Sequence, residues 1–228
     1  MTDKVPIITV DGPSGSGKGT ISQLLASDLG FHYLDSGALY RLLALAAQRH
    51  QVSLDNVEAL AVLAAHMDIT FEMNPDGGPP TVILESEDVS SLIRSEDVGK
   101  NASIVAVIPE VRQALLRRQQ VFAREPGLVA DGRDMGTVVF ADAEVKIYLT
   151  ASAEERAKRR HKQLIDKEES DSLAALIDMV KQRDERDQNR SVSPLRPAEG
   201  AILLDSTKLS VAEVFTAARQ EIRNKLNI

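Results

Sequence analysis

A glycine-rich segment near the start of the chain constrains the fold more than any other feature. It runs from Gly12 to Thr20, between an apolar, β-branched run at 5–10 and a helical pattern at 20–29 that stops at Gly30. Consecutive apolar residues are typical of a strand buried on both faces. A strand, a tight loop and a helix in this order predict an α/β fold with a parallel sheet.

The remainder of the chain predicts more strands and helices in alternation. Apolar runs predict four further strands, at 31–34, 128–130, 145–149 and 201–204. Helical spacing of apolar residues predicts helices after Gly37, after Ser95, from Pro109, from about Ala153, from Ser172 and after Ser210. This order of elements is typical of repeated βαβ units.

One segment breaks this alternation. Residues 67–72 alternate polar and apolar side chains, residues 74–80 are rich in Gly and Pro, and residues 81–85 form a second extended run. The pattern is typical of an antiparallel hairpin. Because a hairpin does not fit within a parallel βαβ series, we expect it in an inserted subdomain at 61–108.

Composition excludes several classes of protein. The 228 residues include 27 basic and 34 acidic side chains, a net charge of −7, which excludes a polybasic nucleic-acid coat. With no cysteine, the chain can form no disulfide, thiolate zinc site or iron–sulfur cluster, and its four histidines lack metal-ligand spacing. We see no leader-like segment and no run of about 18 apolar residues, as a membrane span requires. We therefore expect a cytoplasmic protein without nucleic-acid or membrane partners.

The glycine-rich segment fits the pattern G-x-x-x-x-G-K of phosphate-binding loops, except that Gly19 stands where Ser or Thr is usual. Glycines let backbone N–H groups point into one concavity, the helix N-terminus adds positive charge, and Lys18 can reach the terminal phosphates. The hydroxyl that meets Mg²⁺ is either Ser16 or Thr20. The loop comprises Gly12, Pro13, Ser14, Gly15, Ser16, Gly17, Lys18, Gly19 and Thr20.

Two other clusters of charge are candidate sites. Asp131, Arg133 and Asp134 follow an apolar strand, and ligands of α/β sheets bind at such strand ends. An arginine there can grip a phosphate and a carboxylate can accept from an amino-bearing base, although a satisfied turn is the alternative. The residues at 183, 187 and 190 share one helix face, which by spacing alone is more often a solvated charged face.

Taken together, these motifs resemble those of the bacterial cytidylate kinases, nucleoside monophosphate kinases of the phosphate-loop class. The resemblance covers essentially the whole chain. The matching segments, besides the loop with its leading Asp11, are 34–41, 109–112, 130–138, 183–190 and 204–207. Several ordered motifs are far more specific than the loop alone.

The resemblance implies a parallel-sheet core at 1–60 and 109–228, an acceptor-binding subdomain enlarged around the hairpin, and a helical lid at about 153–170. It implies transfer of the γ-phosphoryl group of ATP, with Mg²⁺, to CMP or dCMP. We expect a monomer, because such kinases close around two substrates and no coiled-coil stripe is present.

The resemblance also implies roles for residues that spacing alone would leave on the surface, such as Ser36, which could merely cap a helix. The acceptor-binding residues are then Ser36, Arg41, Ser103, Arg112, Arg133, Asp134, Arg183, Asp187 and Arg190. Of these, Arg41, Arg133 and Arg190 contact the phosphate, Arg183 and Asp187 the sugar, and Ser103, Arg112 and Asp134 the base. One or two of the lid arginines Arg156, Arg159 and Arg160 contact the transferring group, and Asp131 acts on the metal through water. The catalytic candidates are Lys18, Arg133, Arg156 and Arg160.

Three other functions fit parts of the sequence. A nucleotide-hydrolysing switch would use the same loop, but the chain lacks the Asn-Lys-x-Asp motif that reads guanine. A kinase for another small acceptor, such as UMP, AMP or a hydroxylated metabolite, would use the same core. A pure binding module would not need two separate sets of arginines.

Overall fold

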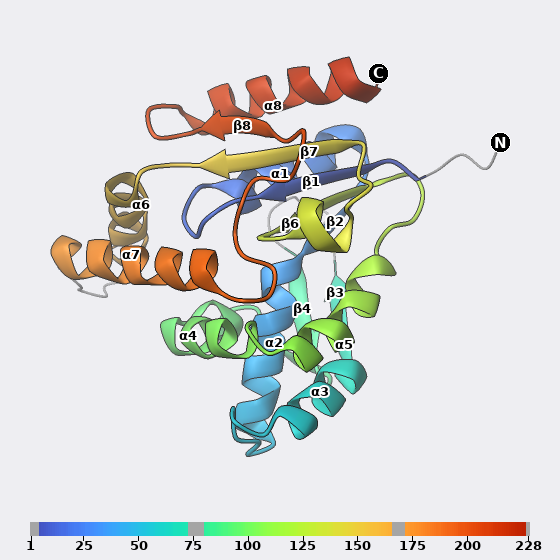
Figure 1. The fold of residues 1–228 in the computed structure, drawn as a ribbon, viewed down its shortest axis with the longest axis vertical. Helices are drawn as coiled ribbons and strands as arrows, with labels where there is room; N and C mark the ends of the chain where they lie inside the picture. Colours follow the sequence, from blue (N-terminus) through green and yellow to red (C-terminus); the bar gives the residue numbers. More distant parts are fainter. Residues whose placement is uncertain (1–4, 73–79, 166–171, 227–228) are drawn as a thin grey trace. The chain divides into compact units, whose positions relative to one another are not determined.

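The computed structural model describes residues 5–72, 80–165 and 172–226. These residues form two compact units (Figure 1). The first takes in the chain up to Leu34 and from Ala123 onward, and the second spans Asp35–Phe122. Each unit is described by itself.

A five-stranded sheet in the order β2-β6-β1-β7-β8 forms the centre of the first unit. Its strands are β1 (Ile7–Asp11), β2 (His32–Asp35), β6 (Leu128–Gly132), β7 (Val145–Thr150) and β8 (Ile202–Asp205). The central strand β1 pairs in parallel with β6 and β7, and β7 pairs in parallel with β8. The parallel sheet and its five strands are therefore confirmed.

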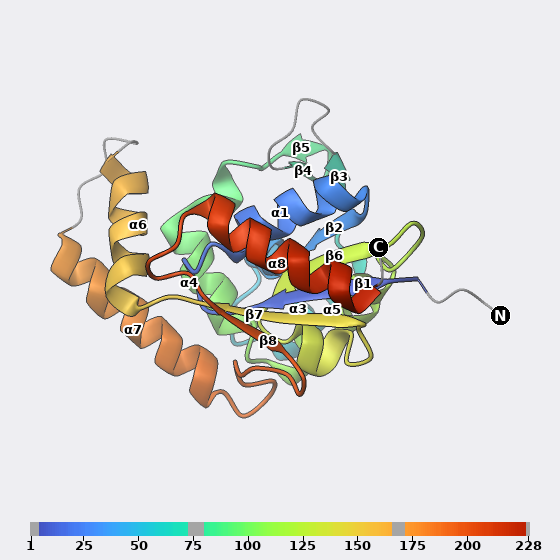
Figure 2. The ribbon, with the colours of Figure 1, turned by 90° about the horizontal axis from the view of Figure 1, so that it is seen from above.

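Two helices, α1 (Lys18–Leu29) and α8 (Val211–Leu226), lie over this sheet (Figure 2). Their buried side chains, such as Leu25 and Ile222, pack with Ile8 of β1 and share one apolar core with β7. Each such side chain contributes roughly 1.5–3 kcal/mol on burial. This core holds the start of α1 at the end of β1.

Two further helices of the first unit, α6 (Ala153–Ile165) and α7 (Leu173–Asn189), form a pair with its own small apolar cluster. The cluster includes Ala157, Leu164 and Leu176. A single π-helical turn, η2 (Met135–Val139), follows β6. The sequence predicted α6 and α7 but not the π-helical turn.

The second unit contains a three-stranded antiparallel sheet, in the order β3-β4-β5, and four α-helices among its described residues. Its strands are β3 (Ile69–Glu72), β4 (Thr81–Leu84) and β5 (Glu87–Asp88). Its helices are α2 (Ser36–Arg49), α3 (Val57–His66), the 3₁₀ turn η1 (Leu92–Arg94), α4 (Glu96–Val105) and α5 (Pro109–Gln120). The predicted hairpin is confirmed as β3 and β4, while residues 73–79 of its turn lie outside the described residues.

Helix α3 was not predicted from the sequence, because its Ala-rich run has no clear polar face. The Asn56 side chain, which accepts from Ala59 N at 3.1 Å, caps this helix and is the signal that could have revealed it. Among the described residues, no helix has the length and apolar character needed to cross a membrane.

Candidate active site

The phosphate loop leaves β1 beside the neighbouring strand β7. A Cβ atom added to Gly12, which has a φ of 155°, would lie 2.0 Å from the carbonyl oxygen of Leu149. Only glycine therefore fits at this position. Gly17, with a φ of 93°, is the N-cap of α1 and has no side chain to bond the N–H groups of the first turn. Such N–H groups at a helix start can bind an anion.

Charged and hydroxyl groups gather around this loop. Lys18 Nζ donates to the carbonyl oxygen of Pro13 at 3.4 Å and lies 3.9 Å from Asp131 Oδ1. Tyr33 donates its hydroxyl to the other Asp131 oxygen at 3.4 Å. The hydroxyl of Ser16 is buried and has no hydrogen-bond partner among the described residues, whereas Thr20 is exposed.

Two of the predicted lid arginines contact the loop through its backbone. Arg156, only 4% exposed, donates to the carbonyl oxygen of Ser14 at 3.1 Å and to both carboxylate oxygens of Asp184 on α7. Arg159 donates to the carbonyl oxygen of Ser16 at 3.2 Å and to that of Ser206 at 2.6 Å. These bonds hold two loop carbonyl groups, which keeps their oxygens turned toward the arginines.

The next arginine along the same helix, Arg160, is half-buried. It lies one residue beyond Arg159 and so points in a different direction around α6. The predicted lid extends beyond α6, but its residues 166–170 lie outside the described residues.

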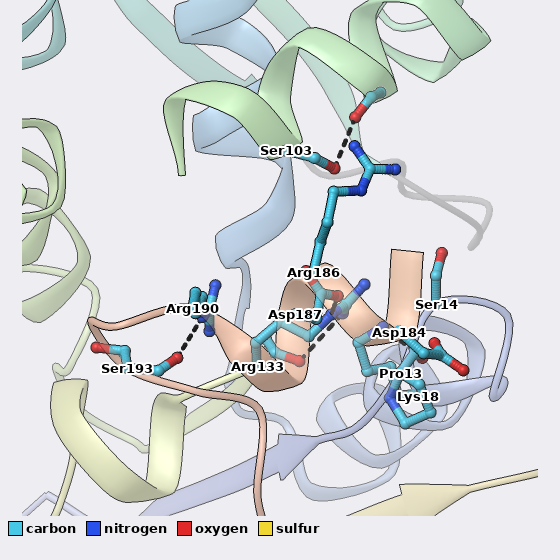
Figure 3. Close-up of polar contacts among 12 residues, drawn as sticks. Pro13, Ser14, Lys18, Ser103, Arg133, Asp184, Arg186, Asp187, Arg190 and Ser193 are labelled. Atoms are coloured by element: carbon cyan, nitrogen blue, oxygen red, sulfur yellow. Dashed lines mark hydrogen bonds and ion pairs between the residues drawn. The ribbon is translucent and has the colours of Figure 1, made fainter. Parts of the chain in front are cut away.

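The predicted residues of α7 meet the end of β6 (Figure 3). Arg133 Nε donates to Asp187 Oδ2 at 2.9 Å. Burial by itself would lower the pKa of Arg133, but the charge and hydrogen bond of Asp187 raise it above its ordinary value. Burial would likewise raise the pKa of Asp187, but Arg133 and then the charges of Arg183 and Arg190 lower it. The pair is therefore ionised.

Arg190 is the C-cap residue of α7, and its Nε donates to the carbonyl oxygen of Ser193 (Figure 3). Asp134, directly after Arg133, is 3% exposed. The structure thus brings the predicted residues of β6 and α7 together in the first unit. It leaves their charges close to one another rather than spread over a solvated helix face.

Four predicted acceptor residues lie in the second unit, where α2 holds the first two. Ser36 is the first residue of α2, but the cap is Asp35, which accepts from Ala38 N at 3.0 Å. The Ser36 hydroxyl is buried and donates to Gln119 Oε1 at 2.7 Å. Ser36 is therefore not the cap that its position before a helix suggested.

Arg41, also on α2, contacts the backbone just before α4, and Ser103 and Arg112 lie on α4 and α5. Arg41 donates to the carbonyl oxygens of Ile93 and Ser95, at 2.6 and 3.3 Å. Ser103 donates to the carbonyl oxygen one turn earlier, at 3.1 Å. Arg112 is buried, donates to the carbonyl oxygen of Ala106 at 3.1 Å, and lies 5.8 Å above the ring centroid of Tyr40.

Three residues of the site were missed or given no role. Asp184 and Ser206 hold the lid arginines, and Asp11 accepts from the backbone after Asp134. Each lies far in sequence from the group that it bonds. Asp11 had one visible signal, since a carboxylate at the end of an apolar strand needs a buried partner.

The parallel sheet has a phosphate loop after β1 and charged pairs at the end of the neighbouring strand β6. These features define a phosphate-loop protein of the α/β class. The family model for cytidylate kinase matches residues 8–224. The chain therefore belongs to the cytidylate kinase family.

Individual relatives match over nearly their full length. A cytidylate kinase of Stutzerimonas stutzeri (strain A1501) is 58% identical over 225 residues, which are 99% of this chain and 98% of the relative. A cytidylate kinase of Colwellia psychrerythraea is 58% identical over 99% of this chain and 100% of the relative. Among solved structures, TT1252 from Thermus thermophilus aligns over 98% of this chain and 99% of its own, with 21% identity and a TM-score of 0.49.

Proposed function

We propose that this protein transfers the γ-phosphoryl group of ATP to CMP or dCMP, giving ADP and CDP or dCDP. The observation that carries the proposal is the pairing of β1 with β6. Asp11 lies opposite Gly132 across this pairing, so the phosphate loop after Asp11 and Arg133 after Gly132 leave the sheet at neighbouring points. A donor phosphate site beside an arginine that can hold an acceptor phosphate is what phosphoryl transfer requires.

The loop from Gly12 to Thr20 binds the phosphates of ATP, with Lys18 neutralising the terminal groups. Mg²⁺ fits this site, because the buried Ser16 hydroxyl has no hydrogen-bond partner among the described residues and the Asp131 carboxylate lies beside Lys18. Oxygen ligands of this kind suit Mg²⁺. Ser16 or the exposed Thr20 would contact the ion directly, and Asp131 through water. When bound, Mg²⁺ neutralises charge on the phosphate oxygens.

The acceptor-binding residues fall into three groups by the part of the nucleotide that each contacts. In this assignment the arginines hold its phosphate, Arg183 and Asp187 hold the sugar, and three side chains read cytosine. The phosphate ligands are Arg41, Arg133 and Arg190, with Ser36 beside them, and the base ligands are Ser103, Arg112 and Asp134. The Arg133–Asp187 ion pair supports this assignment, since it holds a half-buried guanidinium in place at the end of β6.

The protein catalyses the transfer by positioning and charge neutralisation, because the transition state is loose and its charge lies on peripheral oxygens. Lys18, Arg133, Arg156 and Arg160 supply this charge. The acceptor phosphate oxygen is already anionic, so no general base is required. Segment 153–170 acts as a lid that excludes water when it closes.

We also propose how the chain is divided into core and insertion, and where the protein acts. Residues 61–108 form the acceptor-binding insertion between core segments 1–60 and 109–228. The protein acts as a monomer in the cytoplasm, where ATP and nucleoside monophosphates are its small-molecule partners and neither nucleic acid nor membrane is bound.

The decisive experiment measures ADP formation from ATP and Mg²⁺ with the purified protein and a panel of acceptors: CMP, dCMP, UMP, AMP, GMP and none. We expect turnover mainly with CMP and dCMP. The Lys18→Ala variant, prepared in parallel, should lose on the order of 10²-fold in kcat, as the removal of single electrostatic contacts does elsewhere.

The other outcomes separate the alternatives. Turnover with a different acceptor would overturn the base ligands but leave the phosphate loop in place. Hydrolysis that needs no acceptor would assign the protein to the switch class. Binding of ATP without transfer to any acceptor would contradict the whole proposal.

A further inference from the structure

Asp11 occupies a distinctive place in the first unit. It is the last residue of β1, directly before Gly12, and its side chain is 2% exposed. Across the strand pairing it lies opposite Gly132, the residue before Arg133. Asp11 therefore stands between the two segments to which we assign the donor and acceptor phosphates.

Both carboxylate oxygens of Asp11 are used. Oδ1 accepts from the backbone N–H of Met135 and Oδ2 from that of Gly136, each at 2.8 Å. These are the first N–H groups of the π-helical turn η2, and the side chain of its N-cap residue, Asp134, makes no capping bond. The first N–H groups of a helical turn have no partner within the turn. A residue 124 positions away in sequence thus provides the cap.

The turn lies directly against β1. A Cβ atom added to Gly136 would be 2.8 Å from Thr9 Oγ1 and 3.3 Å from Asp11 Oδ2, so a larger residue would push the backbone away from the strand. The backbone of Asp134 is held as well, because its carbonyl oxygen accepts from the N–H groups of Val138 and Val139 at 2.9 and 3.2 Å. Fixing the first N–H groups therefore fixes the residues just before them.

We propose that Asp11 is a positioning residue, which holds the backbone of Met135 and Gly136 and thereby sets the distance between the phosphate loop and the Arg133–Asp134 segment. The proposal rests on the proposed function, since it concerns how that site is aligned for transfer. Asp11 touches neither substrate and acts only through the backbone that it holds. A small error in the placement of reacting groups lowers the rate strongly, because transfer depends on their alignment.

The pKa of Asp11 shows that burial of its carboxylate costs free energy. Burial and the charge of Asp134 raise the pKa of Asp11, while the two backbone N–H groups and the charge of Arg133 lower it, with a net value of about 6. At neutral pH the carboxylate is therefore mostly ionised, and both oxygens can accept. An asparagine of the same shape would present an N–H₂ group to one of the two N–H groups.

The test compares Asp11→Asn with wild type in the acceptor assay. We expect kcat/KM for CMP to fall on the order of 10²-fold, while the KM for ATP changes by less than about twofold, because the loop glycines are untouched. A purely structural role would lower only the fraction of active enzyme, so kcat is expressed per ATP-binding site and would then match that of wild type. An unchanged kcat/KM for CMP in the folded variant would overturn the proposal.

Thr9→Val is the matched control. Thr9 lies on the same face of β1 two residues earlier, and its buried hydroxyl approaches Gly136 but has no hydrogen-bond partner among the described residues. The substitution changes the same interface without removing a bond to the turn. We expect kcat/KM for CMP and the KM for ATP of Thr9→Val to match those of wild type. A fall in kcat/KM for CMP equal to that of Asp11→Asn would overturn the proposal.

Amide hydrogen exchange gives a readout that is independent of activity. The N–H groups of Met135 and Gly136 should be protected in wild type and in Thr9→Val, and should exchange faster in Asp11→Asn, with α8 unchanged. Rapid exchange of these two groups in wild type would overturn the proposal even if Asp11→Asn failed to fold. If wild type phosphorylates no acceptor while the two groups are protected, the proposed function fails and the contact itself stands.

Discussion

The buried carboxylate of Asp11 and the half-buried carboxylate of Asp187 have opposite pKa shifts because their partners differ. Asp187 faces the guanidinium of Arg133, and full opposite charges lower its pKa in spite of burial. Asp11 faces two neutral backbone N–H groups, which do not offset burial, so its pKa rises to about 6. At the scale of single residues, the partner rather than the residue type decides which form is favoured.

The raised pKa of Asp11 predicts a pH dependence of stability. The carboxyl group binds its proton more tightly in the folded protein, at about 6, than at the ordinary value of 3.8. Its contribution is therefore fully present below the ordinary pKa and is lost as the pH rises through the folded pKa. At about 1.4 kcal/mol per pKa unit, the difference is up to about 3 kcal/mol.

Urea denaturation of wild type and Asp11→Asn measures this contribution. The free energy of unfolding of wild type minus that of the variant should increase as the pH falls from about 7 to about 4, because only wild type gains the proton at this site. A difference that stays constant over this range would show that Asp11 has an ordinary pKa in the fold.

At the scale of elements, α6 and α7 are joined by a buried ion pair as well as by apolar packing. Arg156 is 4% exposed and bonds both oxygens of Asp184, and the same guanidinium reaches the phosphate loop through Ser14. Removing one partner of such a buried pair strongly destabilises the folded protein, because the other charge remains buried. The pair therefore couples the predicted lid helix to the loop.

A double-mutant cycle tests this coupling. Arg156→Gln should lower the free energy of unfolding by about 3 kcal/mol or more. Combined with Asp184→Asn, it should give a coupling energy above about 1.5 kcal/mol. The measurement is urea denaturation of the single and double variants.

The same two helices offer a control pair. Glu154 and Lys181 also join α6 to α7, at 3.9 Å, but both side chains are more than half exposed. Exposed pairs contribute about 0–1 kcal/mol, so the coupling of Glu154 to Lys181 should be smaller. Equal coupling in the two cycles would contradict a special role for the buried pair.

At the scale of the whole molecule, an acidic protein must hold two polyanionic substrates. The net charge is −7, yet the arginines of α6 and α7 gather around the phosphate loop and the end of β6 in the first unit. Local charge rather than net charge determines the field at a site. The overall acidity is therefore compatible with nucleotide binding.

The expected monomer is tested by light scattering with size-exclusion chromatography. We expect the mass of one chain, with and without ATP and CMP, because the site is assigned wholly to residues of one chain. A mass of two chains that persists on dilution would contradict this prediction, and a site residue contributed by a second copy would then be sought.

The amino-acid sequence was sufficient to predict the local and periodic features. The apolar runs predicted the five parallel strands, the alternation at 67–85 predicted the hairpin, and the glycine spacing predicted the loop after β1. Such features depend on neighbours within a few residues, and so the sequence pattern carries them. The helix α3 was missed because its run of small apolar residues has no clear period.

Contacts between groups that are distant in sequence became known from the fold alone. Asp11 with the N–H groups of Met135 and Gly136, and Arg156 with Asp184 and Ser14, are joined across long stretches of chain. No spacing rule links such groups, because their encounter depends on strand order and on how helices pack. Burial in its encounter with the turn then raises the pKa of Asp11. The candidate residues were therefore predictable from the sequence, but their partners were not.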